Sequence, residues 1–450
     1  MHPSNVPGRT SGGPVATTHA LPLAGNMKVD VCVVGGGPAG VSAACASARM
    51  NKSVLLVERN GFFGGTLTAV TLGSICGLYR NDGDSHVQLV GGFVSRLQER
   101  LAGLGSRYEP VRWLQAVTLP YDAFAMRAAL DALVVESGVR PMLHACLIDV
   151  ETKADRICGV VVHSHSGAIR VEADVYVDCT GDAELVARAG GSFEVDLENL
   201  QYPTTMFRLA GVDHTAARAL SRPRLHQILE DAVAAGFELP RTAGGIFLDH
   251  GDHAHLNITK VGRPDGSPPN PLDWADLTDA EIAGRKQVLQ YAKAFRERVP
   301  GYSNSYVLDC GSAIGVRESR RIHGRYQLTG KDVLSSRKFD DGIALCSWPM
   351  EEHGRGRATR WIWLEEGKHF EIPFGCLLPQ ALSNVLVAGR CISSTHEAQA
   401  SIRVTAQCFA TGEAAGTAAA LCLQDGVACA DVPIQSLRAA LRQSGSLPNP

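Results

Sequence analysis

The segment 29–58, VDVCVVGGGPAGVSAACASARMNKSVLLVE, constrains the fold of this 450-residue chain more than any other. It begins with an apolar run that ends at Gly35, as a buried parallel strand does. The stretch Val41–Met50 is rich in alanine and serine, which suits a helix pressed against a sheet. A second apolar run, Val54–Val57, ends before Glu58. Strand, glycine-rich turn, helix, strand and acid in this order predict a βαβ unit that binds a dinucleotide.

Each glycine of the G-x-G-x-x-G pattern has its own physical task. The first permits the tight turn, the second lets a pyrophosphate approach the backbone, and the third lets helix and strand pack closely. Glu58 can accept a hydrogen bond from a ribose 2′-hydroxyl, and an acid at this position favours FAD or NAD over NADP. The alternative is a structural glycine-rich turn. The candidate cofactor-binding residues of this unit are Gly35, Gly37, Pro38, Ala39, Gly40, Glu58 and Arg59.

Composition excludes several classes of protein. The formal net charge is −3, with 45% hydrophobic and 20% charged residues, so there is no electrostatic case for nucleic acid or an anionic membrane surface. No apolar run approaches the roughly 18–20 residues that a transmembrane helix needs. Residues 1–26 are rich in Pro, Gly, Ser and Thr and lack a basic-then-apolar signal pattern, which predicts a disordered arm and a cytoplasmic protein.

The 13 cysteines do not have the spacing of metal ligands. There is no C-x-x-C, and Cys422 and Cys429, the nearest pair, are seven residues apart. An odd number of cysteines without a secretion signal is typical of reduced thiols. The sequence therefore predicts free cysteines and no metal site.

Three further segments resemble the surroundings of a nucleotide. GFFGGTLTA follows the ribose acid directly, where its amides and a threonine hydroxyl would extend the cradle, unless it is a flexible surface loop. The strand that ends in VDCTGDAE would reach a ligand at its carboxyl end, with an ordinary turn and Asp182 as helix N-cap as the alternative. Near the C-terminus, NVLVAG predicts another strand. These segments supply the candidates Gly64, Gly65, Thr66, Thr180, Gly181, Asp182, Gly389 and Arg390.

Between these segments the pattern changes. A helix is predicted over Pro120–Glu136 with Phe124 and Leu130 on its apolar face. A longer helix is predicted over Thr278–Arg298, opening on a capping box and turning Ile282, Leu289, Ala292 and Phe295 inward.

From Arg403 onward, small residues crowd a C-terminal helix that must pack very closely against sheet or cofactor. The predicted fold is α/β, a Rossmann-like nucleotide-binding domain assembled from N- and C-terminal segments, with an inserted α+β substrate or cap domain. The predicted boundaries are 1–26 for the arm, 27–200 and 366–425 for the two parts of the nucleotide-binding domain, 201–365 for the inserted domain and 426–450 for a C-terminal tail.

Taken together, these segments resemble the FAD-dependent oxidoreductases of the glutathione-reductase-like superfamily. The nearest group is related to the flavin subunit of heterodisulfide reductase and, more distantly, to fumarate reductase flavoproteins. The resemblance implies that the nucleotide-binding domain is a Rossmann-like FAD-binding domain. It also implies FAD in an extended conformation, with its isoalloxazine near the start of the C-terminal helix. Those relatives bind iron–sulfur clusters through clustered cysteines, which this chain lacks, so no such cluster is expected. The matching segments are VVGGGPAG, GFFGGTLTA, VDCTGDAE, GVRESRRIHGRYQLTGKDV and VLVAGRCISSTHEAQASIRVTAQCFATGEAAGTAAA.

The start of the C-terminal helix supplies candidates for the flavin itself. Its dipole would stabilise an anionic reduced flavin, which makes Arg403, Thr405 and the backbone of Ala406 candidate contacts. The alternative is a core helix that touches no ligand. His396 is the candidate acid/base residue, in a loop beside Glu397 that would orient it, although an exposed or structural histidine is the alternative.

Arginines in GVRESRR suggest how a substrate is held. Helical spacing would place Arg317 on one face with Arg320 or Arg321, where they could clamp a carboxylate or phosphate, or else lie on a solvated face. Arg403 could add a third cation to such a clamp, so Arg317, Arg403 and His396 are the candidate catalytic residues. The predicted function is hydride transfer between a small, anionic organic molecule and flavin N5. The alternatives are a flavin monooxygenase and a redox-inactive FAD-binding module. The partners expected are that substrate and an electron acceptor or reductase, with no nucleic acid and no membrane.

Overall fold

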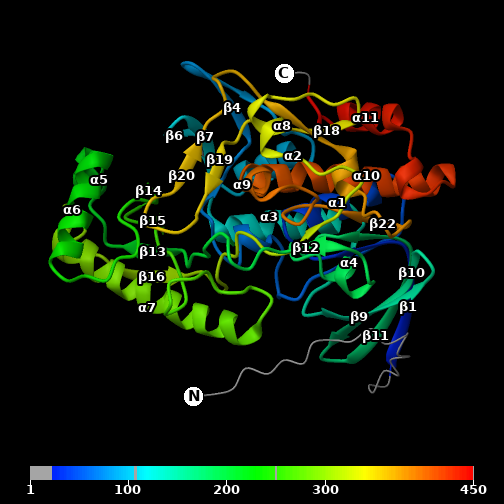
Figure 1. The fold of residues 1–450 in the computed structure, drawn as a ribbon, viewed down its shortest axis with the longest axis horizontal. Coiled ribbons are helices and arrows are strands. Elements are labelled where there is room, and N and C mark those ends of the chain that lie inside the picture. Colours follow the sequence, from blue (N-terminus) through cyan, green and yellow to red (C-terminus); the bar gives the residue numbers. More distant parts are fainter. Residues whose placement is uncertain (1–22, 106–108, 249–250, 449–450) are drawn as a thin grey trace.

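The computed structural model describes residues 23–105, 109–248 and 251–448. Within these ranges the main sheet has seven strands. Parallel pairing joins five of them, and an antiparallel meander extends the sheet on one side (Figure 1). The order is β8 (Arg140–Met142), β2 (Val54–Val57), β1 (Leu23–Val34), β11 (Gly167–Asp178), β10 (Arg156–Ser164) and β9 (Cys146–Lys153), with β22 (Val385–Val387) against β11.

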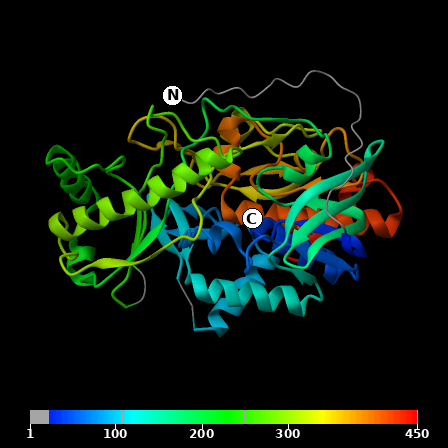
Figure 2. The same ribbon diagram turned by 90° about the horizontal axis from the view of Figure 1, so that it is seen from below.

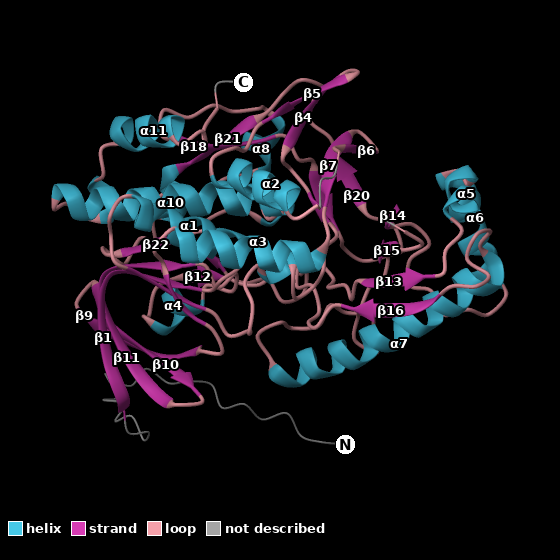
Figure 3. Cartoon of the chain, turned by 180° about the vertical axis from the view of Figure 1, so that it is seen from behind, coloured by secondary structure: helices cyan, strands magenta, loops and turns pink. Residues whose placement is uncertain are grey.

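Two helices from opposite ends of the chain cover this sheet side by side, α1 (Pro38–Arg49) and α10 (Thr405–Asp425) (Figure 3). A Cβ atom on Gly412 would lie 2.2 Å from the Ala39 carbonyl oxygen, and one on Gly416 would lie 2.1 Å from that of Ala43. The helices are therefore too close for any side chain at these two positions. The predicted close packing of the C-terminal helix is confirmed, but these glycines pack against another helix, α1, and not against the sheet or cofactor that the sequence predicted.

The other described elements are short or lie around this core. The remaining helices are α2 (Phe93–Gly103), α3 (Ala123–Glu136), α4 (Glu184–Arg188), α8 (Gly330–Leu334), α9 (His396–Ile402) and α11 (Ile434–Gln443). The described chain also contains three 3-10 turns, Gly65–Leu67, Phe374–Leu377 and Cys429–Asp431. The paired strands are β3 (Ser74–Ile75), β7 (Ala116–Pro120) and β6 (Val111–Trp113), β4 (Tyr79–Asp82) and β5 (Ser85–Gln88), β12 (Phe193–Glu194) and β17 (Arg321–Ile322), β18 (Gly342–Cys346) and β21 (Phe370–Pro373), and β19 (Met350–Glu352) and β20 (Arg360–Ile362).

A second sheet has its own hydrophobic core, which includes Phe207, Leu256, Tyr291 and Phe295. Figures 1 and 2 place this sheet and its helices together at one end of the molecule, away from β1 and the β9–β11 meander. The sheet runs in the order β14 (Gly245–Leu248), β15 (Ala254–Asn257), β13 (Phe207–Ala210) and β16 (Tyr306–Cys310), and its helices are α5 (His214–Ala219), α6 (Arg222–Ala234) and α7 (Trp274–Arg298).

The predicted helix over Thr278–Arg298 begins one turn earlier than expected, at Trp274. Its N-cap is Asp273, whose carboxylate accepts from the amides of the first turn, so the predicted capping box is wrong. Ala292 and Phe295 are buried as predicted, but Ile282 and Leu289 are 44% and 66% exposed. The buried stripe follows Ala280, Gly284, Val288, Tyr291 and Phe295, so those two residues lie beside it.

Three other expectations changed. Phe124 of α3 is 79% exposed because it lies outside the stripe through Met126, Leu130 and Leu133. The predicted arm falls outside the described residues up to residue 22, and from Leu23 onward the chain is already β1, paired with β11. The predicted tail contains α11, whose Leu437 is buried in the main core. In the described part of the chain, no helix combines the length and apolar character needed to cross a membrane.

Candidate active site

Four parallel strands, β1, β2, β11 and β22, end at the same edge of the main sheet, and the loops that follow them line one cavity of about 1590 Å³. Ligands of open α/β sheets bind at such an edge. The volume exceeds the ~300–1,000 Å³ typical of pockets for drug-sized molecules, which leaves room for a dinucleotide and a substrate. The predicted site residues that line it are Gly35, Gly37, Pro38, Ala39, Glu58, Arg59, Gly65, Thr66, Thr180, Gly181, Asp182, Arg317, Gly389, Arg390, Arg403 and Thr405.

The three glycines of the first loop meet the requirements expected of them. Gly35 has a φ of +99°, and a Cβ atom there would lie 2.4 Å from the Cys179 carbonyl oxygen. A Cβ atom on Gly40 would lie 1.7 Å from the Gly35 carbonyl oxygen, so α1 can begin this close to β1 only with glycine. At Gly37 the nearest neighbour of a Cβ atom would be Gly65 Cα at 4.0 Å, and the open side is the cavity. This arrangement fits a pyrophosphate over Gly37 at the N-terminus of α1.

Glu58 is held at the end of β2 by three hydrogen bonds. Its Oε2 accepts from the Gly36 amide at 2.7 Å, and its Oε1 accepts from the Asn60 amide at 2.8 Å and side chain at 2.7 Å. A carboxylate has about four acceptor positions, so Glu58 can still accept from a ribose hydroxyl in the cavity that it lines.

Asp182 connects three parts of the site. Its Oδ1 accepts from Ser319 Oγ and from Arg390 Nη2, both at 2.6 Å. Arg390 also donates to the Val316 carbonyl at 2.6 Å. The N-cap of α4 is Ala183, so the alternative role of Asp182 as an N-cap is wrong. Asp182 instead ties the end of β11 to the loop after β22 and to the segment that carries Arg317.

Three predicted cofactor contacts do not line the cavity. Gly40 lies beneath Gly35, and the Gly64 amide donates to the Gly36 carbonyl at 2.8 Å, which holds the second loop against the first. The Ala406 amide donates to the Cys76 carbonyl at 3.2 Å. These three residues support the loops that line the cavity without facing the cavity themselves.

His396 also lies outside the large cavity. It is the first residue of α9, not part of a loop, and it lines a separate cavity of about 430 Å³. Its Nδ1 is 2.9 Å from Glu318 and its Nε2 is 3.2 Å from Glu352, so the predicted orienting role of Glu397 is wrong. The hydrogen bond to Glu318 raises the pKa of His396, against the opposing effect of burial. His396 as placed connects elements of the fold, and its proposed acid/base role stays a prediction.

Residues 315–321 are not helical, so the shared helical face predicted for the arginines is wrong. The Gly315 amide donates to the Thr204 carbonyl at 2.7 Å, an interaction across the chain that a helix could not make. Each arginine has a different environment as a result. Arg317 points into the cavity, Arg320 donates to the Asp182 carbonyl at its edge, and Arg321 is buried in ion pairs with Glu318 and Glu194.

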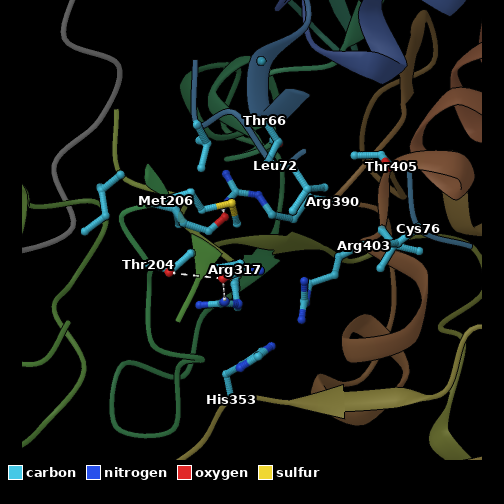
Figure 4. Close-up of a pocket in the computed structure, with 18 of the residues that line it drawn as sticks. Thr66, Leu72, Cys76, Thr204, Met206, Arg317, His353, Arg390, Arg403 and Thr405 are labelled. Atoms are coloured by element: carbon cyan, nitrogen blue, oxygen red, sulfur yellow. Dashed lines mark hydrogen bonds between the residues drawn. The ribbon is translucent and has the colours of Figure 1, made fainter. Parts of the chain in front are cut away.

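Arg317 and Arg403 nevertheless meet in the cavity, where Arg241 and His353 join them. Figure 4 shows Arg317, Arg403 and His353 turned toward one shared space. Burial lowers the pKa of Arg317 well below its ordinary value, and repulsion from Arg403 and Arg241 lowers it further. Burial likewise lowers the pKa of Arg241 and of Arg403. We call Arg241, Arg317 and Arg403 the arginine cluster.

Glu351 is the carboxylate closest to this cluster. Its Oε2 is 3.6 Å from Arg403 Nη2 and its Oε1 is 2.9 Å from His353 Nε2. Burial alone would raise the pKa of Glu351, but His353, Arg403 and Arg317 lower it to about 2. Burial also lowers the pKa of His353 well below its ordinary value, followed by repulsion from Arg317, so the imidazole is neutral near neutral pH. One ionised carboxylate thus faces three guanidinium groups: Arg403 lies within 4 Å of it, and Arg317 and Arg241 act on it electrostatically.

Sequence reasoning missed Arg241, Glu351 and His353. They come from just before β14 and from the end of β19, segments that carry no recognisable pattern. The signal available was chemical: MEEH places a carboxylate two residues before a histidine in a strand, which puts both side chains on one face.

The start of α10 offers a further polar group to a ligand. The hydroxyl of Thr405 is buried, lines the cavity and has no hydrogen-bond partner among the described residues. An unpartnered buried hydroxyl costs free energy unless something bound satisfies it. Together with the open space over Gly37, this orphaned group fits the FAD that the sequence predicts.

The cysteines are all free. Cys422 and Cys429 lie with their sulfur atoms 3.9 Å apart near the end of α10. Within the residues that the structure describes, no group of three or more His, Cys, Asp or Glu side chains is arranged to hold a metal ion.

Comparison with known proteins gives a family and distant relatives. Residues 30–441 match the family described as FAD dependent oxidoreductase. Thiamine thiazole synthase of Methanococcus vannielii is 26% identical over 250 residues, covering 53% of this chain and 90% of that protein. The protein of that name from Methanococcus aeolicus is 26% identical over 170 residues, and the match spans 36% of this chain and 58% of its own length. A geranylgeranyl bacteriochlorophyll reductase-like structure from Thermoplasma acidophilum covers 93% of this chain and 83% of its own, with 13% identity and a TM-score of 0.49.

Proposed function

Since the chain belongs to the family of FAD-dependent oxidoreductases, we propose that it transfers a hydride between a small, anionic organic substrate and N5 of FAD. Bound FAD supplies the two-electron acceptor or donor for that transfer. The chain's own residues must then bind the substrate anion, orient it and move the accompanying proton.

The arginine cluster is the observation that carries this proposal. Arg241 and Arg317 are almost fully buried, and Arg403 is largely so. The one carboxylate closest to them, Glu351, leaves an excess of positive charge in the cavity wall. Uncompensated buried charge is unfavourable, and an anion that enters the cavity relieves it. Guanidinium groups match a carboxylate through paired hydrogen bonds, which also fixes the orientation of the substrate.

His353 is the residue best placed to move a proton. Its Nε2 lies against the ionised Glu351, which requires the proton on Nε2 and leaves Nδ1 as an acceptor, 3.3 Å from Thr359 Oγ1. Arg241 donates to that same hydroxyl at 3.1 Å. When an anion binds beside Arg317, it offsets the repulsion that lowers the pKa of His353. In the oxidising direction the substrate loses one hydrogen as a hydride, which bound FAD would accept, and one proton from its neighbouring O–H, N–H or C–H group. His353 is the residue that would accept that proton.

The test replaces Arg317 and Arg403 separately by Met and measures anaerobic bleaching of bound FAD by a panel of hydroxy acids, enoates and amino acids. A hydrogen bond to a charged group contributes ~1.5–3 kcal/mol, so each variant should lower kcat/KM by about 10- to 100-fold. Arg100→Met is the matched control, because Arg100 is exposed on α2 and pairs only with Glu136 in the described structure. Unchanged bleaching in both variants would refute an anionic substrate. In a separate assay that mixes the reduced protein with O2, incorporation of an oxygen atom from O2 into the product would indicate a monooxygenase instead.

A further inference from the structure

We propose, building on the function proposed above, that the substrate is an aromatic carboxylate. Its ring would lie against three tryptophans that adjoin the arginine cluster. We call Trp113, Trp348 and Trp361 the tryptophan wall, and all three line the large cavity.

The wall is assembled from segments far apart in the sequence. Trp113 ends β6, Trp361 is central in β20, and Trp348 lies between β18 and β19. The ring centroids of Trp113 and Trp361 are 5.2 Å apart at 61°, and those of Trp348 and Trp361 are 6.4 Å apart at 66°. Figure 1 shows β6 and β20 side by side. The three rings therefore form one continuous aromatic surface.

This surface is rigid. Trp363 stacks on Trp361 at 5.3 Å and 13°, and it is not among the residues that line the cavity. Trp348 is almost fully buried, and its indole N–H donates to Glu351 Oε2 at 3.2 Å. Because each ring has a neighbour or a hydrogen bond that fixes it, the wall is preorganised for a flat partner.

The same hydrogen bond joins the wall to the charged part of the cavity. Glu351 accepts from Trp348 on one side and lies 3.6 Å from Arg403 on the other. A molecule whose carboxylate binds the arginine cluster can therefore place the rest of its structure against Trp348. An aromatic carboxylate satisfies both surfaces at once.

The orientation of the rings favours an aromatic partner over a saturated one. Inclined by 61° and 66°, the indoles present both faces and edges to the cavity. Faces carry partial negative charge and edges partial positive charge, which a second aromatic ring complements and a saturated ring does not. The Arg222 guanidinium, which also lines the cavity, lies over the Trp113 ring at 5.1 Å from its centroid.

The experiment uses the full chain loaded with FAD and measures binding by calorimetry under anaerobic conditions, with 2-naphthoate, its decahydro analogue and acetate as probes. We expect a Kd for 2-naphthoate about tenfold below that of the decahydro analogue. Trp361→Leu and, separately, Trp113→Leu should remove most of this preference, while Trp361→Phe should retain it. Trp274→Leu is the matched control, since Trp274 is 81% exposed at the start of α7 and does not line the cavity.

The outcomes separate this inference from the function on which it rests. Equal affinity for the aromatic and saturated acids, or a preference that survives both tryptophan-to-leucine variants, would overturn the aromatic substrate and leave the anionic substrate intact. Binding of neither acid nor acetate, or binding that Arg317→Met does not weaken, would overturn the proposed function itself. If one tryptophan variant does not fold, two measurements still test the inference. They are the effect of the other variant and the ratio of the wild-type Kd values for 2-naphthoate and its decahydro analogue.

Discussion

Replacing Glu351 by glutamine should destabilise the protein while improving its affinity for carboxylates. The substitution keeps the shape of the side chain but removes the negative charge that the arginine cluster and His353 surround. The pKa of Glu351 is about 2 against an ordinary value of 4.5. At 1.36 kcal/mol per pKa unit, its ionisation contributes at most about 3 kcal/mol to the free energy of unfolding at neutral pH, because part of the shift requires a charged His353, which is neutral there. Breaking buried ion pairs costs about 3–5 kcal/mol, which agrees.

The pH dependence follows from the direction of this pKa shift. A carboxyl whose pKa is lowered in the folded state stabilises the fold above its unfolded pKa, and this contribution is lost as the pH falls toward the folded value. The difference in unfolding free energy between wild type and Glu351→Gln should therefore be constant above about pH 5 and shrink between 4.5 and about 2. Urea unfolding followed by far-UV circular dichroism at pH 7, 5, 4 and 3 measures it.

The matched control is Glu136→Gln, which breaks an exposed ion pair with Arg100. Exposed pairs contribute at most about 1 kcal/mol, so this variant should differ little from wild type. If the free energy of unfolding of Glu351→Gln lies within about 1 kcal/mol of wild type at pH 7, or if the difference does not decline in acid, Glu351 does not balance the charge of the arginine cluster. Carboxylate affinity, measured in the same preparations, should rise in Glu351→Gln, because repulsion is removed.

Three further predictions address the cofactor, the proton and the packing. Gly37→Val should abolish the flavin absorbance because its side chain enters the space left for the pyrophosphate, whereas Gly103→Val, with nothing within 4 Å of its Cβ position, should retain stoichiometric FAD. If His353 moves the proton as proposed, His353→Gln should lower the rate of flavin reduction by substrate about 100-fold or more and His396→Gln should leave it unchanged; the reverse result would show that His396 is the acid/base residue, as the sequence predicts. Gly416→Ala should lower the free energy of unfolding by about 1–3 kcal/mol in denaturant titrations, because its methyl carbon would collide with the Ala43 carbonyl oxygen of α1. Unchanged stability would contradict the close spacing of α1 and α10.

The nucleotide cradle could be predicted from the sequence because backbone geometry dictates its residues. Where a turn needs a positive φ or a helix begins against a strand, as at Gly35 and Gly40, only glycine fits, and the requirement is visible as a spaced pattern. The close packing of the C-terminal helix was visible for the same reason. These requirements for glycine or another small residue are visible in the sequence because they involve neighbouring residues or a regular spacing along one helix.

The substrate end of the cavity could be predicted only in part. Arg317 and Arg403 were candidates from the sequence, but Arg241 and Glu351 were not, because the four residues come from segments that meet only in the folded chain. The same limit explains the error at Gly315, where pairing with Thr204 over a long sequence separation overrode helical spacing. The sequence shows which positions carry arginine or glutamate, but only the tertiary structure shows which of these side chains lie together.

The glycine-to-carbonyl packing of α10 on α1 has a consequence for biosynthesis. The βαβ unit is complete once Glu58 leaves the ribosome, yet the helix that covers it and carries Thr405 is made about 350 residues later. At ~5–20 residues per second, the small-residue surface of α1 stays uncovered on the nascent chain for roughly 20–70 s. During translation the N-terminal unit therefore lacks the helix that carries Thr405. If Thr405 contacts FAD as the sequence predicts, stable loading waits for the C-terminal segment, and in that interval the small-residue face of α1 remains uncovered.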